Sequence, residues 1–300
     1  GIFSHGNGTV IFNSGAGSAT ILPRNSDFYK VRFDNALTTF YLSGSTINFK
    51  GDFEILNGTV TPATNNYTYN IEGDFINSGG TFTPVAGGVT NGTVVFNSAV
   101  DQNITGGTFY NLTIDGSNDK ITNGTATIDN VTTINSTLRA NAGSNIDFNG
   151  NVTINTGGTF NDGGENHTFT GRNWTGDGNY TGTGTMVFDR TVNNQNIYGG
   201  TFYDLDVNCT TESCDLFGDV TINNDLTIRS GVIDMDLNTY QITNSSGTGT
   251  FTMENSTYLF VSGAGNFPAG FGTYDLGNTT RVYYNGITDQ AVAAVTYGHV

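Results

Sequence analysis

The chain has 300 residues and a net charge of −16, which arises from ten Lys and Arg against 26 Asp and Glu. A nucleic-acid-binding protein needs a basic face, so this charge excludes nucleic acid and anionic membrane surfaces as partners. No stretch approaches about 18 consecutive apolar residues, so no membrane insertion is expected. Gly, Asn and Thr take the place of charged residues, yet 21 Phe and 14 Tyr supply enough apolar mass for a long, thin core.

Short strands with alternating apolar and polar residues are predicted along the whole chain, between turns rich in Gly, Asn and Asp. They lie near residues 9, 29, 47, 69, 93, 109, 127, 151, 168, 185, 202 and 220, a mean step of about 19 residues. The sequence GGTF recurs at Gly79, Gly106, Gly157 and Gly199. No helical periodicity is longer than about two turns, so an all-β fold is predicted.

A composite unit of about 90 residues repeats at a longer scale. Its opening strand is GTVIF at Gly8, GTVVF at Gly92, GTMVF at Gly184 and TRVYY at Thr280. A second anchor in each copy is a tyrosine: Tyr29, Tyr110, Tyr203 and Tyr297. The predicted repeats are residues 5–87, 88–182, 183–277 and a truncated copy, 278–300, so the chain is interpreted as a mature or partial segment of a longer polypeptide.

A short step with glycine corners predicts a parallel β-solenoid, or β-helix, in which each coil adds a layer of about 4.8 Å. Residues 1–300 are expected to form a single continuous solenoid of about 15 coils of roughly 20 residues. The alternative is a string of tandem immunoglobulin-like β-sandwiches of about 100 residues each. Against the alternative, GGTF falls inside the repeats as well as between them, and Trp174 is the only tryptophan.

Seventeen Asn-x-Ser/Thr sequons make Asn-linked glycans the one attached group that the sequence suggests. They are Asn7, Asn57, Asn66, Asn91, Asn103, Asn111, Asn123, Asn130, Asn135, Asn151, Asn166, Asn173, Asn179, Asn208, Asn244, Asn255 and Asn278. The competing interpretation is that a Thr-rich strand produces Asn-x-Thr by its alternation alone. Loop and turn sequons such as Asn57, Asn91, Asn166 and Asn179 are expected to be better acceptors than those on crowded strand faces.

Cys209 and Cys214 are the only cysteines, and a local disulfide is predicted for them in an oxidising compartment. Two thiols without a nearby His make a poor zinc site, so no metal is expected. Two loop clusters offer oxygen ligands for calcium: Asp115, Asn118 and Asp119, and Asp162, Glu165 and Asp177. Neither follows a known calcium-loop spacing, and turns without an ion are the favoured interpretation.

Little in the sequence supports catalysis, and no catalytic residue is assigned. The three histidines, His5, His167 and His299, lie in different repeats. β-Helices do host polysaccharide-degrading enzymes, which is kept as a remote alternative. Trp174 with Tyr180 is a candidate for stacking on a sugar, although a place in the internal aromatic column competes with that function.

The strings GGTFYNLTIDG at Gly106 and GGTFYDLDV at Gly199 resemble the repeats of very large bacterial and archaeal surface proteins. Those are adhesin-like, filament-forming and sheath-forming β-solenoid chains. The first copy departs from the pattern, since FYKVRF at Phe28 lacks a preceding GGT. The resemblance implies an extracellular, structural or adhesive function and carries over no catalytic residue.

The expected function is therefore an extracellular structural protein, a subunit or segment of a cell-surface filament, sheath or fibre. Solenoid ends present unpaired strand edges, so a head-to-tail homopolymer is predicted. The residues expected at the junction are Val10 and Phe12 at one end and Val282, Tyr284 and Tyr297 at the other, within residues 1–12 and 280–300. The alternative is a non-polymerising adhesin or carbohydrate-binding stalk, with surface glycans as its partners.

Overall fold

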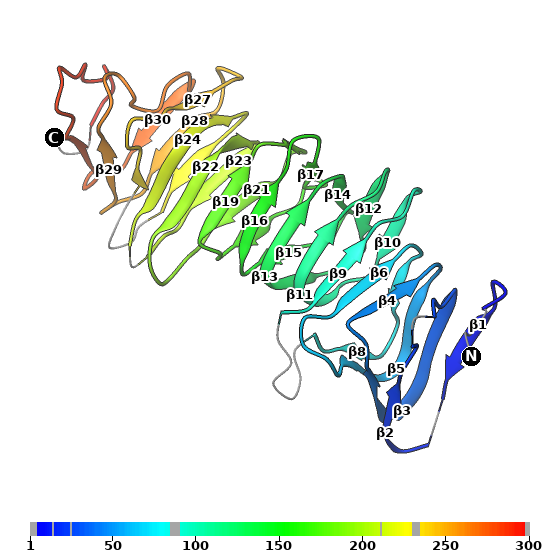
Figure 1. The fold of residues 1–300 in the computed structure, drawn as a ribbon. Helices are drawn as coiled ribbons and strands as arrows, with labels where there is room; N and C mark the ends of the chain where they lie inside the picture. Colours follow the sequence, from blue (N-terminus) through cyan, green and yellow to red (C-terminus); the bar gives the residue numbers. More distant parts are fainter. Residues whose placement is uncertain are drawn as a thin grey trace. The chain divides into compact units, whose positions relative to one another are not determined.

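The computed structural model describes residues 5–13, 15–24, 26–84, 91–210, 212–229 and 235–297. Every regular element in these ranges is a β-strand; they contain no helix, and so none that could cross a membrane. The chain divides into two compact units, Gly1–Ile146 and Asp147–Val300. Each unit is a parallel β-solenoid (Figure 1), which confirms the predicted fold class and shows that the sandwich alternative is wrong.

The first unit contains strands that stack in three columns, one for each face of a turn. The strands are β1 (Thr9–Phe12), β2 (Gly17–Ile21), β3 (Lys30–Leu42), β4 (Thr46–Phe49), β5 (Phe53–Pro62), β6 (Thr68–Ile71), β7 (Phe75–Asn77), β8 (Thr81–Phe82), β9 (Thr93–Phe96), β10 (Gln102–Ile104), β11 (Gly107–Ile114), β12 (Asp119–Thr122), β13 (Ala126–Ile134) and β14 (Thr137–Ala140). One column is β1-β3-β5-β7-β10-β12-β14, a second is β4-β6-β9-β11-β13, and β2, β3, β5 and β8 form the third.

The second unit has the same organisation, and all of its pairings are parallel. Its strands are β15 (Ile146–Phe148, which begins at the last residue of the first unit), β16 (Asn151–Ile154), β17 (Thr159–Asn161), β18 (His167–Phe169), β19 (Asn173–Gly176), β20 (Asn179–Thr181), β21 (Thr185–Phe188), β22 (Gln195–Phe202), β23 (Asp204–Val207), β24 (Cys214–Ile222), β25 (Leu226–Ile228), β26 (Met235–Asp236), β27 (Ile242–Asn244), β28 (Thr250–Met253), β29 (Tyr258–Val261), β30 (Thr273–Leu276) and β31 (Arg281–Tyr284). One column is β15-β18-β21-β23-β25-β28-β30 and another is β16-β19-β22-β24-β26-β29-β31.

The step between turns is about 21 residues, close to the predicted 20, but there are about 12 turns rather than 15. The predicted number of 15 is therefore too high, and the spacing varies from turn to turn. Phe53 pairs with Phe75, 22 positions later, whereas Phe75 pairs with Ile104, 29 positions later. Extra residues at a corner lengthen the connection and leave the stacked strands in register, because surface loops accept insertions at low cost.

The interior of the first unit is a column of phenylalanines. The alternation predicted from the sequence places Phe33, Phe53 and Phe75 inward with almost no solvent exposure. The rings of Phe53 and Phe75 stack with centroids 5.5 Å apart and an interplanar angle of 9°. Each buried Phe removes an apolar area worth roughly 2 to 3 kcal/mol, and stacking adds about 0.5 to 1.5 kcal/mol.

The interior of the second unit contains the only tryptophan. Trp174, in β19, is 1% exposed and meets the rings of Phe148, Phe169, Phe188 and Phe202 at centroid distances of 5.4 to 6.0 Å. The candidate role of Trp174 in sugar stacking is therefore wrong, and so is that of Tyr180, which is 7% exposed and packs against Phe160. Both side chains lie at inward-facing positions of their strands, where burying their large apolar surface stabilises the fold.

The GGTF motif has a conformational basis at three of its four positions: both glycines have positive φ angles in two copies, and Gly157 alone has one, 90°, in a third. Gly106 and Gly107 have φ angles of 57° and 136°, and Gly199 and Gly200 have 80° and 131°. Such values are strained for any residue with a Cβ atom. In both places the glycines change the direction of the backbone just before an inward phenylalanine of the same strand, Phe109 in β11 and Phe202 in β22, which explains why GG precedes TF there.

The long sequence repeat does not correspond to a whole number of turns. In the first unit, GTVIF forms β1, in the column with β3 and β5, whereas GTVVF forms β9, in the column with β4 and β6. In the second unit, GTMVF and TRVYY also lie in different columns, as β21 and β31. Any face can accept the same strand because all three offer the same parallel edge and an apolar interior.

Candidate functional sites

The N-terminal end turn leaves two strands at an edge. β1 and β2 both pair with β3, and within the described residues no strand lies on their other side. Val10 and Phe12 point toward the core but are only half-buried, and the outward Ile11 is 50% exposed. Phe12 packs on Phe33 with ring centroids 5.3 Å apart. The end of the core therefore lies open at this edge.

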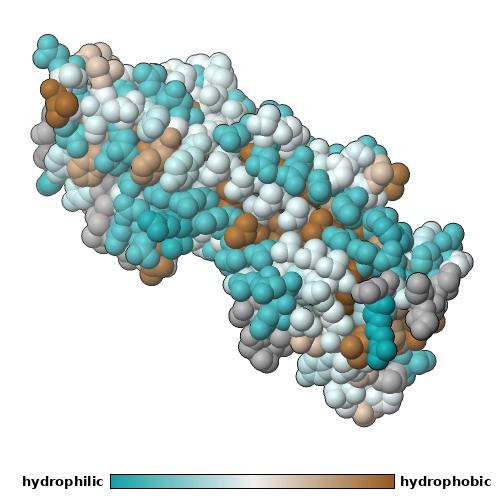
Figure 2. Space-filling view, viewed as in Figure 1, coloured by the Kyte–Doolittle hydropathy of each residue, from teal (hydrophilic) through white to brown (hydrophobic). Residues whose placement is uncertain are grey.

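A cavity of about 440 Å³ marks this open end. Its lining is mainly apolar: Val10, Phe12, Ala19, Thr20, Ile21, Leu22, Pro23, Ser26 and Phe28. Elsewhere, the visible surface is mostly hydrophilic to neutral, with hydrophobic residues in small separate groups (Figure 2). An apolar concavity beside two unpaired strand edges is a surface suited to another strand.

The C-terminal end turn is tied to the turn before it. Val282 and Tyr284 of β31 lie opposite Leu259 and Val261 of β29, and no described strand lies beyond β31. The Ala293 N–H donates to the Tyr284 hydroxyl over 3.1 Å, and the Tyr297 hydroxyl donates to the Ala293 carbonyl over 3.0 Å. The two hydroxyl oxygens are 2.7 Å apart, so Tyr284 donates to Tyr297. Burial and this bond raise the pKa of Tyr297.

These observations place the five residues predicted for the junction. Val10 and Phe12 lie in β1, and Val282 and Tyr284 lie in β31. Tyr297 is hydrogen-bonded to the Tyr284 hydroxyl. Residues 1–4 and 298–300, which belong to the predicted junction, lie outside the described residues. The contact between copies remains a prediction.

Three glutamines fix corners of the solenoid, and sequence reasoning missed them. In each case the side-chain Nε2 donates to two carbonyl oxygens, two residues apart, on the preceding turn. Gln102 reaches Ile71 and Gly73, Gln195 reaches Phe169 and Gly171 at 2.8 and 2.9 Å, and Gln290 reaches Val261 and Gly263 at 2.7 and 3.0 Å. Gln102 and Gln195 are at most 1% exposed. In each corner the first carbonyl (Ile71, Phe169 or Val261) also accepts a backbone N–H from the following turn, so the amide adds a second donor there and supplies the donor for the glycine carbonyl two residues on.

A sequence signal for these corners exists. The chain has four glutamines, and three of them stand seven residues before an aromatic residue: Phe109, Phe202 and Tyr297. Tyr297 therefore corresponds to the buried phenylalanines of the earlier corners rather than to Tyr110 and Tyr203. At the C-terminal end turn, the hydroxyl of Tyr297 bonds to the Ala293 carbonyl and to the Tyr284 hydroxyl, which a phenylalanine at this position could not do.

Lys120 and Asp162 are buried charged residues whose partners are backbone groups. The Lys120 ammonium donates to the carbonyls of Ser98, Ser117 and Asn118, and burial lowers its pKa although Asp101 and other acids oppose the shift. The Asp162 carboxylate accepts the N–H groups of Gly164, Thr183 and Gly184 at 2.7 to 3.0 Å. Asp162, a candidate calcium ligand from the sequence, is thus bonded within its own corners.

Polar side chains form ladders on the outer faces, each rung one turn from the next. In one ladder the Asn123 amide donates to the Asn103 side-chain oxygen over 3.0 Å, and the Asn141 amide donates to that of Asn123 over 2.6 Å. Asn103 in turn donates to Asp74 over 3.4 Å. A carboxylate only accepts, so Asp74 fixes the orientation of every amide above it.

The same arrangement recurs in both units. Asn48 donates to Asp27 and Asn70 to Asn48, each over 2.8 Å, while Asn208 donates to Asp189 over 3.1 Å. Ion pairs also join consecutive turns: Lys30–Asp52, Arg32–Glu54, Lys50–Glu72, Arg139–Asp119 and Arg229–Asp206. The scarce basic residues are used as bridges between turns, which accounts for a surface with little free positive charge.

The sequon asparagines fall into three groups by exposure. Nine are exposed: Asn7, Asn66, Asn91, Asn135, Asn151, Asn166, Asn179, Asn255 and Asn278. Seven are half-buried: Asn57, Asn103, Asn111, Asn123, Asn130, Asn173 and Asn208. Asn244 is buried and holds a corner through Asn224 and Ser246. Asn57, expected in a loop, lies instead within β5 and donates to Asp34 over 2.9 Å.

Cys209 and Cys214 are disulfide-bonded in the structure, with Cα atoms 6.0 Å apart. Both are buried, and Cys214 begins β24. The bond closes a short corner between β23 and β24, at the position where Gln195 of the preceding turn pairs with Cys214.

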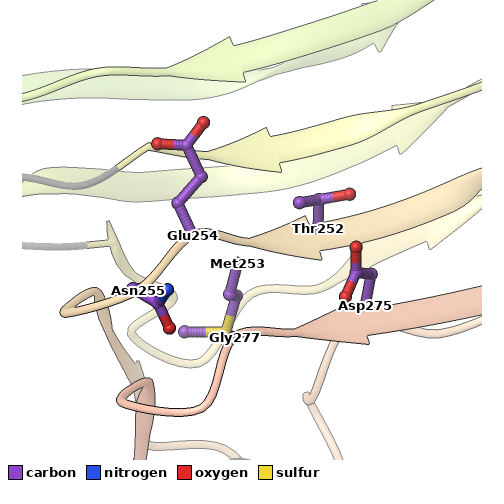
Figure 3. Close-up of a pocket in the computed structure, with 6 residues that line it drawn as sticks. All are labelled: Thr252, Met253, Glu254, Asn255, Asp275 and Gly277. Atoms are coloured by element: carbon purple, nitrogen blue, oxygen red, sulfur yellow. The ribbon is translucent and has the colours of Figure 1, made fainter.

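A shallow concavity in the second unit collects acidic side chains (Figure 3). It is lined by Thr252, Met253, Glu254, Asn255, Asp275 and Gly277, and Figure 3 shows Thr252, Glu254 and Asp275 projecting to one side and Met253 to the other. Glu254 accepts a hydrogen bond from Arg229 over 3.4 Å. No group of three or more metal-ligating side chains occurs in the parts of the chain that the structure describes.

Comparisons with known proteins give no further assignment. The chain matches no protein-family model, no curated protein and no solved structure.

Proposed function

We propose that the chain is an extracellular structural protein, a subunit or segment of a cell-surface filament, sheath or fibre that assembles end to end. The observation that carries the proposal is the pair of end turns, each of which presents a parallel strand with one unpaired edge among the described residues. Parallel edges accept a further parallel strand at the spacing already used inside each unit.

The two edges match in the character of their residues. In β1 the half-buried Val10 and Phe12 alternate with outward Thr9 and Ile11, and β31 repeats this order of half-buried and exposed positions. A second copy placed in register would set Val10 on Val282 and Phe12 on Tyr284. This contact would extend the aromatic column and cover the apolar cavity at β1.

The proposal includes that the chain is not an enzyme and has no cofactor other than Asn-linked glycans. What supports it is the use of buried charged groups, because Lys120 donates to three backbone carbonyls and Asp162 accepts three backbone N–H groups. Their charges stabilise corners.

A second candidate is a carbohydrate-binding stalk that stays monomeric, and surface aromatics favour it. Tyr198 and Phe217 are 40% and 42% exposed and stack with centroids 5.1 Å apart. Phe260 and Tyr283 stack at 5.0 Å on the outer face of β29 and β31. Planar rings at the surface suit contact with the apolar face of a sugar.

The test is the concentration dependence of assembly in solution, followed by sedimentation and electron microscopy. Ile11→Lys places a charge on the β1 edge, and Tyr283→Lys does so on the β31 edge, which is how natural edge strands avoid pairing. Each is expected to raise the concentration needed for assembly at least about tenfold, equivalent to about 1.4 kcal/mol. Val100→Lys, at a residue 63% exposed and remote from both edges, is the matched control and should assemble normally.

A wild-type chain that stays monomeric at its solubility limit would contradict end-to-end assembly and leave the stalk as the better candidate. Filaments that form equally well from all three variants would show that assembly uses another surface.

A further inference from the structure

We propose that Asn-linked glycans are carried by a defined subset of the seventeen sequons, the asparagines in exposed turns just before a strand, and not by those whose amide belongs to a ladder. The turn set is Asn7, Asn66, Asn91, Asn166, Asn255 and Asn278; Asn135, which also precedes a strand, is not in the set because its side chain or backbone already interacts with another residue. The ladder set is Asn57, Asn103, Asn111, Asn123, Asn130, Asn208 and Asn244. The inference needs exposure to a glycosylating pathway but not end-to-end assembly.

The ladder set has its amide nitrogens already engaged. Asn130 donates to the Asn111 side-chain oxygen over 2.7 Å, and Asn123 donates to that of Asn103 over 3.0 Å. Each of these side chains has a polar neighbour on an adjacent turn, at a strand spacing of about 4.8 Å. A sugar on such a nitrogen would have to fit between neighbours already in contact, and it would replace one of the two N–H hydrogens of an amide that already donates to a neighbour.

The turn set presents its amides differently. Asn7, Asn66 and Asn91 have φ angles of 59°, 55° and 65°, a left-handed conformation that Asn tolerates better than most residues. All six side chains are exposed, and none of their amide nitrogens donates to another described residue in the hydrogen bonds of the structure. The hydroxyl residue of the sequon then lies at or near the start of the strand, as Thr9 does in β1 and Thr68 in β6.

The reaction that the turn set would undergo is simple to balance. The Asn side-chain nitrogen forms a bond to the anomeric carbon of a sugar carried on a phosphate-linked donor. The phosphate-linked carrier leaves with the electron pair of its bond to that carbon, and the nitrogen loses one proton. If the sugar is added before folding, a chain modified in the ladder set cannot close its turns, so the folded protein still carries glycans only in the turn set.

The experiment is glycopeptide mapping by mass spectrometry of the folded chain, secreted from a eukaryotic host that transfers glycans to Asn-x-Ser/Thr. Two matched variants each remove one sequon without changing its asparagine. Thr9→Ala removes the turn sequon at Asn7, and Thr125→Ala removes the ladder sequon at Asn123; both threonines are exposed.

The expected result is occupancy in the turn set and none in the ladder set. Thr9→Ala should lose one glycan in mass, and Thr125→Ala should lose none. A glycan on any ladder asparagine of the folded protein, or bare asparagines throughout the turn set, would overturn the proposal. Either result can be obtained whether or not the chain forms filaments, so this test and the assembly test fail independently.

Discussion

At the corners of this solenoid, single polar side chains form the hydrogen bonds to backbone carbonyls that water would otherwise form. A corner turns its carbonyls toward the interior, and an unpaired buried carbonyl costs about 1 to 3 kcal/mol. Gln102, Gln195 and Gln290 each donate to two corner carbonyls with one amide, one of which also accepts a backbone N–H, and Lys120 donates to three carbonyls with one ammonium. The residues most sensitive to substitution are therefore these few polar ones as well as the aromatic core.

Gln195→Leu tests this view. The substitution keeps the approximate volume but removes both bonds from the Gln195 amide: the Gly171 carbonyl loses its donor, and the Phe169 carbonyl keeps only the backbone N–H of Asp189. We expect the free energy of unfolding to fall by about 1 to 3 kcal/mol, measured by urea denaturation. Gln241→Leu, at an exposed position, is the control and should change stability by less than about 0.5 kcal/mol. Equal effects of the two substitutions would refute the corner role.

His167 makes stability depend on pH. Its ring is fully buried and its Nε2 lies 2.9 Å from the Asp162 carbonyl oxygen, which calls for a neutral ring with the proton on Nε2. Burial lowers the pKa of His167 below 6.5, although Asp162 opposes the shift. Below pH of about 6.5 the unfolded chain binds a proton that the native ring does not, so stability falls as the pH falls, by at most about 1.4 kcal/mol per pH unit.

The measurement compares urea denaturation at pH 7.5 and pH 5 for the wild type and His167→Phe. Other groups titrate in both proteins, so only the difference between the two pH dependences reports on His167. We expect the wild type to lose more stability on acidification than the variant. An identical loss in both would show that the buried ring contributes nothing to the pH dependence.

At the scale of the element, a strand is held by the turn on each side of it and by the ladder that runs over it. In an isolated strand Asn has low β propensity. In the stack, Asn103, Asn123 and Asn141 bond along the axis in one direction, which Asp74 sets as an acceptor at the first rung. At the other end of the ladder, the Arg139 guanidinium donates to the side-chain oxygen of Asn141 over 2.9 Å, so the last amide also has a donor.

Asn123→Asp should break this ladder in the middle. The new carboxylate still accepts from Asn141, but it faces the Asn103 oxygen without a proton to donate. We expect a loss of about 1 to 3 kcal/mol by thermal or urea denaturation of the chain made without glycans. Asn166→Asp makes the same chemical change in an exposed turn and should be close to neutral. A loss in Asn166→Asp as large as that in Asn123→Asp would argue against the ladder.

At the scale of the whole molecule, stability is a sum over turns, because each turn contacts only its neighbours. In a stack of this kind, the apolar core is exposed at each end turn until another segment or strand covers it. The two ends differ in this respect: Tyr284, Tyr297 and Gln290 bind the last turn to the one before it, whereas Val10 and Phe12 remain beside an open apolar cavity. If copies assemble end to end as proposed, the β1 edge gains more from a partner strand, and a charge there is expected to block assembly most easily.

Much of the fold could be predicted from the sequence, because the signals are local. The alternation in Val152–Ile154 and the glycines at Gly106 and Gly199 are decided by strand pleat and backbone sterics, which act within a few residues. The alternation expected at Tyr110–Leu112–Ile114 holds only for Leu112 and Ile114, because the register shifts between Phe109 and Asn111 and Phe109 is buried in place of Tyr110. The predicted number of turns was too high, and the spacing varies from turn to turn. Trp174 lies in the internal aromatic column, the place favoured for it from the sequence, and its candidate role in sugar stacking is excluded by its burial.

The sequence by itself determined that this chain is a parallel β-solenoid with a step near 20 residues, since period-two alternation and glycine corners leave few other folds. Only the tertiary structure decided which asparagines are ladder rungs and which stand free in turns. A ladder joins residues about 20 positions apart, such as Asn103 and Asn123, and that pairing exists only once two turns are stacked in register. The same reason explains why one motif, GTVIF or GTVVF, lies on different faces: the parallel edge that it joins is created by the preceding turn rather than by its own residues.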